Sequence, residues 1–552
     1  MSDQDIERRM RLFTRYLESG GMEKKDYQYD GVRWCLMNEL RAHPSNTVDV
    51  RGGFFADEMG LGKTIQMIGL MVANMVRNTL IVVPPILVDQ WNAQILRTTG
   101  HKSLVYSSAT KRRITQGQLE QARVVITTYS MVAQHYPEYE ENKIQQIKWA
   151  RVIFDEAHHL RNQTIKQDSA CMLQSECKWL VSGTPIQNRK RDFYGLCRVV
   201  GLPDWYYKNP EYLFTLANYY ILKRTKKQVG VQLPPVHSKK HIVEWQSDKE
   251  KELSEAIHSA LSFSKVSRDR GTQHAIVCAF DRHETQLPLF LRARQSCTIP
   301  RMMVKALDDL VSRGIVDTYD DHIDALQGNS KLSAVASAIA SHKGNGMGKL
   351  VFCHFRDEMD DLALQLRIHG FDRVAVFDGR TKMAERYAIL TAKYEVLLIQ
   401  INTGCEGLNL QEHYSEVYFV SPHWNPSVEA QAIARLHRLG QKNVVRVNRF
   451  VMSCFDPSTT TIDKYARNVQ HKKKDLVREM FTKFHQGNHV DIVPPEPQAV
   501  VADVLYHGPN GLHRGPHEVR YGQITHVPVM ATATLVTLPV AFATVVQNEE
   551  FK

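Results

Sequence analysis

Two short motifs in the first third of the chain have the residue types that hydrolyse a nucleoside triphosphate. The first runs from Asp57 to Thr64 and reads Asp-Glu-Met-Gly-Leu-Gly-Lys-Thr. A glycine-rich turn ending in Lys-Thr offers backbone N–H groups and an ammonium group to phosphates, and a hydroxyl to a metal ion. The second motif is Asp155-Glu156-Ala157-His158. We expect Asp155 to hold magnesium through its water shell and Glu156 to polarise the attacking water.

Each motif also has an ordinary explanation when it is taken alone. Asp57 replaces the first glycine of the general pattern G-x-x-x-x-G-K-T, so the first motif could be a simple glycine-containing turn. Asp155-Glu156 could be a solvated acidic turn. The flanks favour the catalytic interpretation, because residues 54–56 end an apolar strand pattern, residues 65–70 open an apolar-periodic helix, and Asp155 follows the β-rich run 151–154. Open parallel sheets bind ligands at this carboxyl edge.

A pair of arginines in the second half of the chain could complete the same site. Arg435 and Arg438 lie three positions apart, which predicts that they share one face of a helix. Two guanidinium groups suit the charge that builds during phosphoryl transfer, so the pair is a candidate arginine finger; the alternative is a solvated helix surface. Because Asp155 is far away in sequence, a shared site must form in a cleft between two domains. A cleft that closes on nucleotide and opens after hydrolysis is a motor.

The elements that must position these residues form two similar units along the 552-residue chain. Short apolar strands alternate with helical stretches in residues 24–202 and again in residues 330–482, which indicates two α/β lobes with parallel sheets and crossover helices. Residues 203–329 have a mainly helical, charged pattern and are predicted to form an insertion and linker. We expect residues 1–23 to be an N-terminal helical segment and residues 483–552 to be a loosely ordered tail.

Composition excludes several other classes of protein. The net charge of +11 fits a polyanion partner or a merely basic intracellular protein, and the basic cluster at residues 223–227 could lie along DNA phosphates or form a solvated face. The nine cysteines include no CxxC pair, so we expect neither a zinc ribbon nor a disulfide framework, and an intracellular location follows. Because the N-terminus is charged, we do not expect it to be a signal peptide. Residues 527–546 are uncharged, but Pro528 and Pro539 interrupt them, so we expect extended structure and no membrane partner.

The motifs, taken in order, resemble those of the Swi/Snf-type ATPases, the double-stranded-DNA translocases of helicase superfamily two. The resemblance covers about residues 25 to 480. It implies two RecA-like lobes with helical insertions between them, ATP hydrolysis with magnesium, and movement along duplex DNA without general strand separation. The segments that carry it are residues 57–66, 155–158, 182–188, 407–410 and 431–441.

The resemblance also assigns roles to single positions. Gln28 matches a glutamine that reads adenine, and Gln431 belongs with Arg435 and Arg438 to the motif that reaches the triphosphate. Thr64 and Asp155 match the magnesium-binding residues. The phosphate loop contributes Asp57, Gly60, Leu61, Gly62, Lys63 and Thr64. The residues that match segments tracking the DNA backbone are Trp91, Thr128, Thr184, Asn188, His354, Thr403 and Trp424.

Two positions depart from the family pattern. Ala434 stands where the family usually has Asp or Gly, and Cys405-Glu406 replaces a pair of small residues. The arginines and Glu156 are intact, so we expect an active ATPase. The finer pattern is most similar to the branch of helicase-like transcription factors and Lodestar-type termination factors, several of which carry a RING zinc module between the lobes. Residues 230–330 contain two cysteines, too few for two zinc sites, so a RING insert is not expected.

We therefore expect an ATP-dependent double-stranded-DNA translocase that remodels or displaces DNA-bound protein. The alternatives are a catalytically weak DNA-binding scaffold and a strand-separating helicase. The expected partner is the backbone of duplex DNA, with nucleosomes and RNA polymerase complexes as candidate cargoes and with targeting supplied by other proteins. The expected location is the nucleus or, for a virus-encoded chain, the viral replication compartment or virion.

Overall fold

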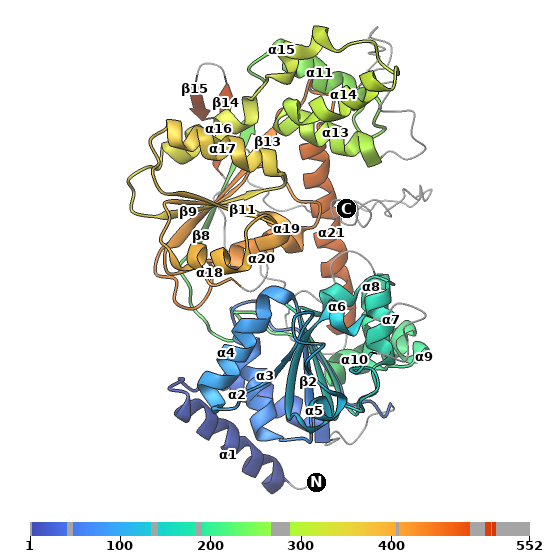
Figure 1. The fold of residues 1–552 in the computed structure, drawn as a ribbon. Helices are drawn as coiled ribbons and strands as arrows, with labels where there is room; N and C mark the ends of the chain where they lie inside the picture. Colours follow the sequence, from blue (N-terminus) through green and yellow to red (C-terminus); the bar gives the residue numbers. More distant parts are fainter. Residues whose placement is uncertain are drawn as a thin grey trace, which may run out of the picture.

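The chain folds into two α/β lobes stacked end to end (Figure 1). The structure is a computed structural model. It describes residues 3–40, 48–133, 142–183, 190–266, 287–404, 408–485, 503–508 and 511–514.

Lobe one is built on a seven-stranded parallel sheet in the order β3-β4-β2-β5-β6-β1-β7. Its strands are β1 (Gly52–Phe55), β2 (Thr79–Val83), β3 (Leu104–Tyr106), β4 (Val124–Thr128), β5 (Arg151–Asp155), β6 (Lys178–Val181) and β7 (Ile221–Leu222). Strands β1, β2, β4, β5 and β6 are buried at every position, as expected for a parallel sheet covered on both faces.

Helices cover both faces of this sheet. One core cluster joins the sheet to α1 (Asp3–Ser19), α2 (Asp26–Leu40), α3 (Lys63–Ala73) and α4 (Val88–Thr99). The other face is covered by α5 (Gln116–Gln121), α6 (Tyr129–Val132), α7 (Ile165–Met172), α8 (Lys190–Val200), α9 (Asp204–Lys208) and α10 (Leu213–Tyr220). Short 3-10 helices include Pro85–Leu87, Ala157–Leu160 and Pro210–Tyr212.

Lobe two contains an eight-stranded sheet in the order β10-β11-β9-β12-β13-β8-β14-β15. All neighbours are parallel except β14 and β15, which form an antiparallel hairpin at the edge. The strands are β8 (Val236–Val243), β9 (Gly348–Cys353), β10 (Val374–Phe377), β11 (Val396–Gln400), β12 (Tyr414–Phe419), β13 (Val445–Met452), β14 (Asp503–Gly508) and β15 (Gly511–Arg514).

The helices of lobe two also divide between two core clusters. On the face toward lobe one lie α18 (Met383–Thr391), α19 (Ile401–Gly404) and α20 (Pro426–Ala434). The opposite face packs against α16 (Ser330–Ala340) and α17 (Arg356–Ile368), and against the inserted α11 (Asp248–Ser259), α13 (Leu287–Thr298), α14 (Val304–Ser312) and α15 (Ile323–Leu326). Two further 3-10 helices are Pro300–Met303 and Asp320–His322.

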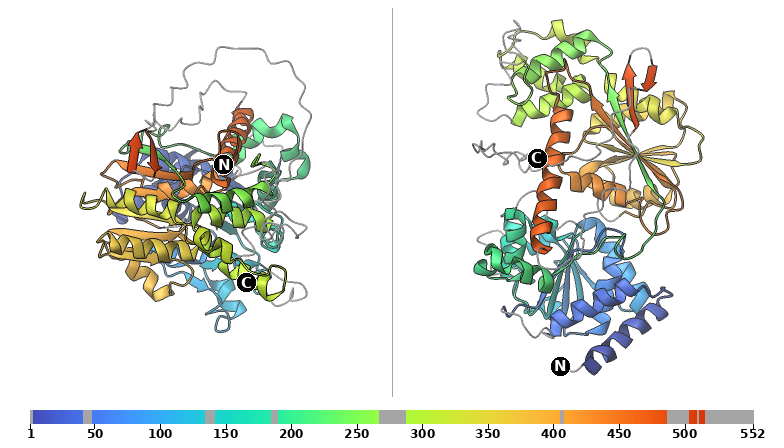
Figure 2. Two further views of the ribbon diagram at one scale, coloured as in Figure 1. Left: turned by 90° about the horizontal axis from the view of Figure 1, so that it is seen from above. Right: turned by 180° about the vertical axis from the view of Figure 1, so that it is seen from behind.

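One long helix connects the lobes directly. Helix α21 (Ile462–His485) begins in the core of lobe two, where Ile462 is buried, and runs down to lobe one (Figures 1 and 2). Farther along the helix, Val477 packs against the core cluster that contains α10. The lobes are therefore joined by a rigid element as well as by the chain between β7 and β8.

The predicted fold class, α/β with two parallel-sheet lobes, is confirmed. Four strands fall outside the regions in which strands were expected: β7 and β8 lie within the predicted insertion 203–329, and β14 and β15 lie in the predicted tail 483–552. β7 forms one edge of the first sheet, and β8, β14 and β15 extend the second sheet beyond β13. The pairing of β7 with β1 and of β8 with β13 is decided by segments that are distant in sequence. Within the described residues no helix is both long and apolar enough to span a membrane. Residues 527–546 lie outside the described part of the chain.

Candidate nucleotide site at the interface of the lobes

The phosphate loop occupies the turn between β1 and α3, as its flanking patterns predicted. Gly60 and Gly62 have φ of 92° and 78°, which favour glycine. A side chain at Gly62 would place its Cβ 2.6 Å from Nε2 of Gln28, and one at Gly60 would lie 3.2 Å from Cβ of Arg438. The loop is therefore closely covered by the predicted adenine-reading residue on one side and by lobe two on the other.

Lys63 is held by the carbonyl groups of its own loop. Its Nζ atom donates to the backbone oxygen of Asp57 at 2.9 Å and reaches that of Glu58 at 3.5 Å. Burial lowers the pKa of Lys63, while the nearby charges of Glu156, Asp57 and Asp155 act in the opposite direction. The ammonium group thus lies between the phosphate loop and the acidic motif, where the outer phosphates of a triphosphate are bound in loops of this type.

The side chain of Asp57 has a structural role that the sequence did not reveal. It is fully buried and faces Arg224, whose Nη2, Nε and backbone N lie 2.5, 3.0 and 3.1 Å from its two oxygens. Arg224 also donates to the backbone oxygen of Tyr27. The carboxylate therefore fastens the loop to the segment after β7, and what Asp57 directs toward Lys63 is its backbone carbonyl.

Asp155 and Glu156 lie at the carboxyl end of β5, opposite the phosphate loop. Oδ2 of Asp155 accepts a hydrogen bond from Nε1 of Trp91 at 2.7 Å, and Oδ1 accepts from the backbone N of Glu156 at 3.0 Å. Burial and the neighbouring charge of Glu156 raise the pKa of Asp155 to about 6. Glu156 has φ of 51°, a left-handed conformation that is uncommon for a side chain of this kind and that concentrates at functional sites.

The arginines of lobe two meet this motif across the interface. Nη2 of Arg435 lies 4.0 Å from Oε1 of Glu156, and burial together with the charge of Arg435 lowers the pKa of Arg438 to about 10. The prediction that both arginines share a helical face is wrong, because α20 ends at Ala434. The backbone oxygen of Arg435 accepts from the N–H of Leu410 instead of continuing the helix. Both side chains therefore follow the helix in a tight turn.

Lys226 forms a second bridge between the lobes. Its Nζ atom lies 3.1 Å from Oε1 of Glu58 in the phosphate loop and donates to the backbone oxygen of His437 in lobe two at 2.9 Å. The cluster at residues 223–227, which contains Arg224 and Lys226, was expected to lie along DNA phosphates or to form a solvated face, and these contacts were not expected. The alternation of Lys and Arg next to a strand gave no indication of them.

The residues present fit a magnesium ion that binds together with a nucleotide. No group of three His, Cys, Asp or Glu side chains gathers as a metal site in the described ranges. Magnesium in nucleotide sites is usually held by one or two carboxylates together with phosphate oxygens. Asp155, whose pKa is raised by burial and by the neighbouring charge of Glu156, and the hydroxyl of Thr64 in the first turn of α3 provide such a set.

Several residues predicted to contact DNA are buried instead. Trp91 is 1% exposed and its indole is bound to Asp155, so the prediction that it contacts DNA is wrong. His354 is 7% exposed and lies 2.7 Å from Nη2 of Arg294; burial and that charge hold its pKa well below its usual range. Thr128 is equally buried and its hydroxyl pairs with that of Ser130 at 2.9 Å. The polar groups of these side chains are therefore engaged within the protein.

The remaining predictions are located only in part. Trp424 is partly buried, with the guanidinium of Arg294 6.0 Å from its ring and Phe290 packed against its edge. Gln431 is buried in α20. Thr403 lies in α19, but its side chain is outside the described set, and Thr184, Asn188 and Cys405-Glu406 lie outside the described residues.

These elements define a class of protein: a nucleotide hydrolase whose site is divided between two stacked α/β lobes. Comparison with known families then specifies it. The model of the SNF2-related domain matches residues 27–302, half of the chain, and that of the helicase conserved C-terminal domain matches residues 330–440. The chain belongs to the SNF2-related family, and it is a DNA-dependent ATPase of the Swi/Snf type.

Individual relatives span the same region. A probable global transactivator of Orgyia pseudotsugata multicapsid polyhedrosis virus is 26% identical over 83% of this chain and 91% of its own length. The ISWI chromatin-remodeling complex ATPase ISW2 of Saccharomyces cerevisiae is 26% identical over 79% of this chain, which spans only 39% of that protein. A solved structure of a Sulfolobus solfataricus SWI2/SNF2 ATPase core in complex with dsDNA is 19% identical, with a TM-score of 0.36, and the match covers 85% of this chain and 98% of that one.

Proposed function

We propose that this ATPase moves along double-stranded DNA and uses that movement to displace or remodel DNA-bound protein. The observation that supports the proposal most directly is the division of the site. Glu156 belongs to lobe one and Arg435 to lobe two, and their side chains approach to 4.0 Å. Hydrolysis changes the charge between these groups, so it changes the free energy of holding the lobes together.

In the proposed reaction, residues of both lobes act on the terminal phosphate. Lys63 exchanges its bonds to the loop carbonyls for bonds to phosphate oxygens, and Glu156 orients the attacking water and accepts its proton. Arg435 and Arg438 reach across to the charge that develops on the transferred group. A bound magnesium ion, held by Thr64 and Asp155, would neutralise phosphate charge at this position.

Contacts outside the site connect its chemistry to the arrangement of the lobes. Lys226 bonds both Glu58 of the phosphate loop and the carbonyl of His437, while Arg224, two residues earlier, is fixed to Asp57. A shift of the loop is therefore passed to the segment between the lobes and to the turn that carries Arg438. Such coupled displacement is what a stepping motor needs.

The net charge of +11 and the family favour duplex DNA as the track, contacted through its backbone. Nucleosomes are the first candidate cargo, since one relative is the ATPase of a chromatin-remodeling complex. Transcription complexes are the second candidate cargo, since another relative is a probable viral transactivator. The proposed locations are the nucleus and a viral replication compartment.

The test is steady-state ATP hydrolysis without nucleic acid, with single-stranded DNA and with duplex DNA, together with displacement of a triplex-forming strand from duplex. We expect duplex DNA to stimulate turnover and ATP to drive displacement. The E156Q variant should bind ATP and DNA but turn over at least about 100-fold more slowly, since a positioned general base contributes this much. Stimulation by single strands alone would refute the duplex-translocase proposal, and turnover by E156Q at the unchanged rate would remove Glu156 from its role.

A further inference from the structure

A cavity of about 650 Å³ lies at the end of lobe one that is far from the nucleotide. Its walls come from α1, α3 and α4 and from the first residues of three strands: Thr79 of β2, Val124 of β4 and Arg151 of β5. Asp155 is at the other end of β5, and Figure 1 shows α1 at the pole of the molecule opposite lobe two. A ligand in this cavity would leave the ATP site and the interface of the lobes free.

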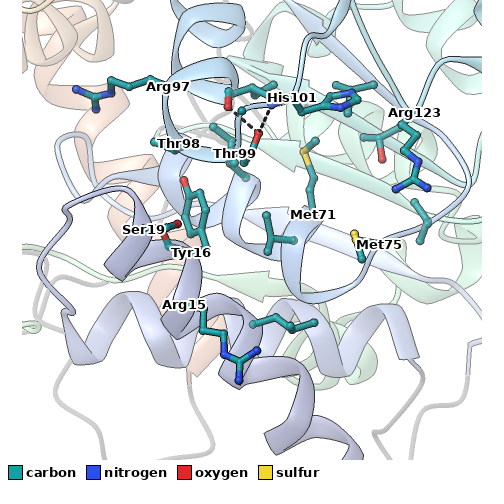
Figure 3. Close-up of a pocket in the computed structure, with 18 of the residues that line it drawn as sticks. Arg15, Tyr16, Ser19, Met71, Met75, Arg97, Thr98, Thr99, His101 and Arg123 are labelled. Atoms are coloured by element: carbon teal, nitrogen blue, oxygen red, sulfur yellow. Dashed lines mark hydrogen bonds between the residues drawn. The ribbon is translucent and has the colours of Figure 1, made fainter.

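The lining combines an apolar floor with a basic rim (Figure 3). Ile68 and Ile95 form part of a buried floor, and Met75, which is 69% exposed, stands at the opening. Methionine adapts its shape to varied partners. The volume is in the range of sites that enclose small ligands or the anchoring side chains of a peptide.

The charges around the cavity are all of one sign. Among the described residues that line it there are four arginines and His101 but no Asp or Glu. Arg151 is neutralised from behind by the buried carboxylate of Glu39, to which its Nε donates at 2.5 Å. Arg15, Arg97 and Arg123 form no salt bridge to any carboxylate in the described ranges of the chain, so three guanidinium groups remain to attract an anion.

The positions of these arginines indicate what kind of anion fits. Figure 3 shows Arg15, Arg97 and Arg123 on separate sides of the opening, with their guanidinium groups directed apart. A ligand with one acidic head group could engage only one of them. A chain with several carboxylates and an apolar side chain between them could engage all three and fill the floor. Duplex DNA would meet the charge but has no apolar group to enter the cavity.

We propose that this cavity is a docking site for an acidic peptide segment of a partner protein, anchored by a large apolar side chain between carboxylates. A partner bound at such a site could recruit the ATPase to a particular location on DNA without occupying the ATP site or the interface between the lobes. It is independent of the direction and substrate of translocation.

A random 12-residue peptide library displayed on phage, selected against the full chain, tests the proposal. The S19W variant, altered at an exposed position of the cavity wall on α1, fills the opening, and the R15E/R97E/R123E variant reverses the rim. We expect the unmodified chain to enrich peptides that combine Asp or Glu with Phe, Leu, Met or Trp, and neither variant to do so. A fluorescein-labelled selected peptide should bind each variant at least 10-fold more weakly in anisotropy measurements.

The matched control is R112E/R113E/R313E, which changes the net charge equally at exposed arginines away from the cavity and should bind the peptide as the unmodified chain does. Enrichment of the same peptides by S19W would overturn the proposal, as would selected peptides without acidic residues. Displacement of the peptide by an equal concentration of a 20-base-pair DNA duplex would show that the rim binds nucleic acid, and would overturn it too.

Discussion

The contact between Asp57 and Arg224 leads to a quantitative prediction about the phosphate loop. The carboxylate is fully buried and accepts three hydrogen bonds from one residue that lies after β7. Removal of one partner from a buried ion pair leaves an uncompensated charge and costs about 3–5 kcal/mol. We expect D57A to lower the free energy of unfolding of lobe one by an amount near the lower end of this range, because the side chain of Arg224 is 16% exposed and keeps its bond to the backbone of Tyr27.

The complementary variant should be worse. R224M removes the two side-chain donors from a fully buried carboxylate and leaves it only the backbone N–H of residue 224, so its cost should lie near about 5 kcal/mol. The double variant D57A/R224M removes both charges and should be destabilised by much less than the sum of the single changes, which is the signature of direct coupling. Urea unfolding followed by tryptophan fluorescence measures this, since five of the seven tryptophans belong to lobe one. A cost below about 1 kcal/mol for both single variants, or additive costs, would refute the reasoning.

Three further predictions concern the site and the core. R435A and R438A should each lower kcat for ATP at least about 100-fold with a smaller effect on KM, as for arginine fingers in general; equal kcat for all three chains would exclude them from the transition state. W91F removes a hydrogen bond from the buried carboxylate of Asp155, a loss of about 1–3 kcal/mol, and should lower kcat/KM about 10-fold. DNA affinity, measured by anisotropy, should stay unchanged. A weaker DNA affinity would instead support the prediction that Trp91 contacts DNA. Burial lowers the pKa of His258 to about 4. Below pH 6.5 the imidazole therefore binds a proton in the unfolded chain before it does so in the folded one, and the free energy of unfolding should fall by up to about 3 kcal/mol between pH 7 and pH 4. In the H258Q variant the free energy of unfolding should depend less on pH over this range.

Local patterns predicted much of the site. The phosphate loop and the acidic motif each lie between a strand and a helix that their own neighbouring residues encode, so their geometry could be inferred from a few positions. Trp91 could not be interpreted in this way, because the group that binds its indole is Asp155, on another strand. A tryptophan in a helix that opens with polar residues has the same sequence pattern whether it faces DNA or a buried carboxylate.

The interface of the lobes shows the same limit. Arginines at positions 435 and 438 were expected on one helix because their spacing suits it, yet the N–H of Leu410 takes the carbonyl that the next helical turn would use. The role of Arg224 also depends on a residue far away in the chain, and its buried partner, Asp57, looked like a defect in the loop pattern. Departures from a motif are thus informative when the fold supplies the partner that explains them.

Helix α21 has a mechanical consequence for the arrangement of the two lobes. From Ile462, which is fixed in lobe two, to Val477, which touches lobe one, the helix spans about 22 Å at 1.5 Å per residue. A rotation of lobe two by about 10° would sweep the position of Val477 through about 4 Å, which is enough to separate packed side chains. Small rotations thus meet a steep resistance and larger ones release the contact. The two lobes are therefore expected to occupy discrete orientations, because the contact of α21 with lobe one resists rotation between them.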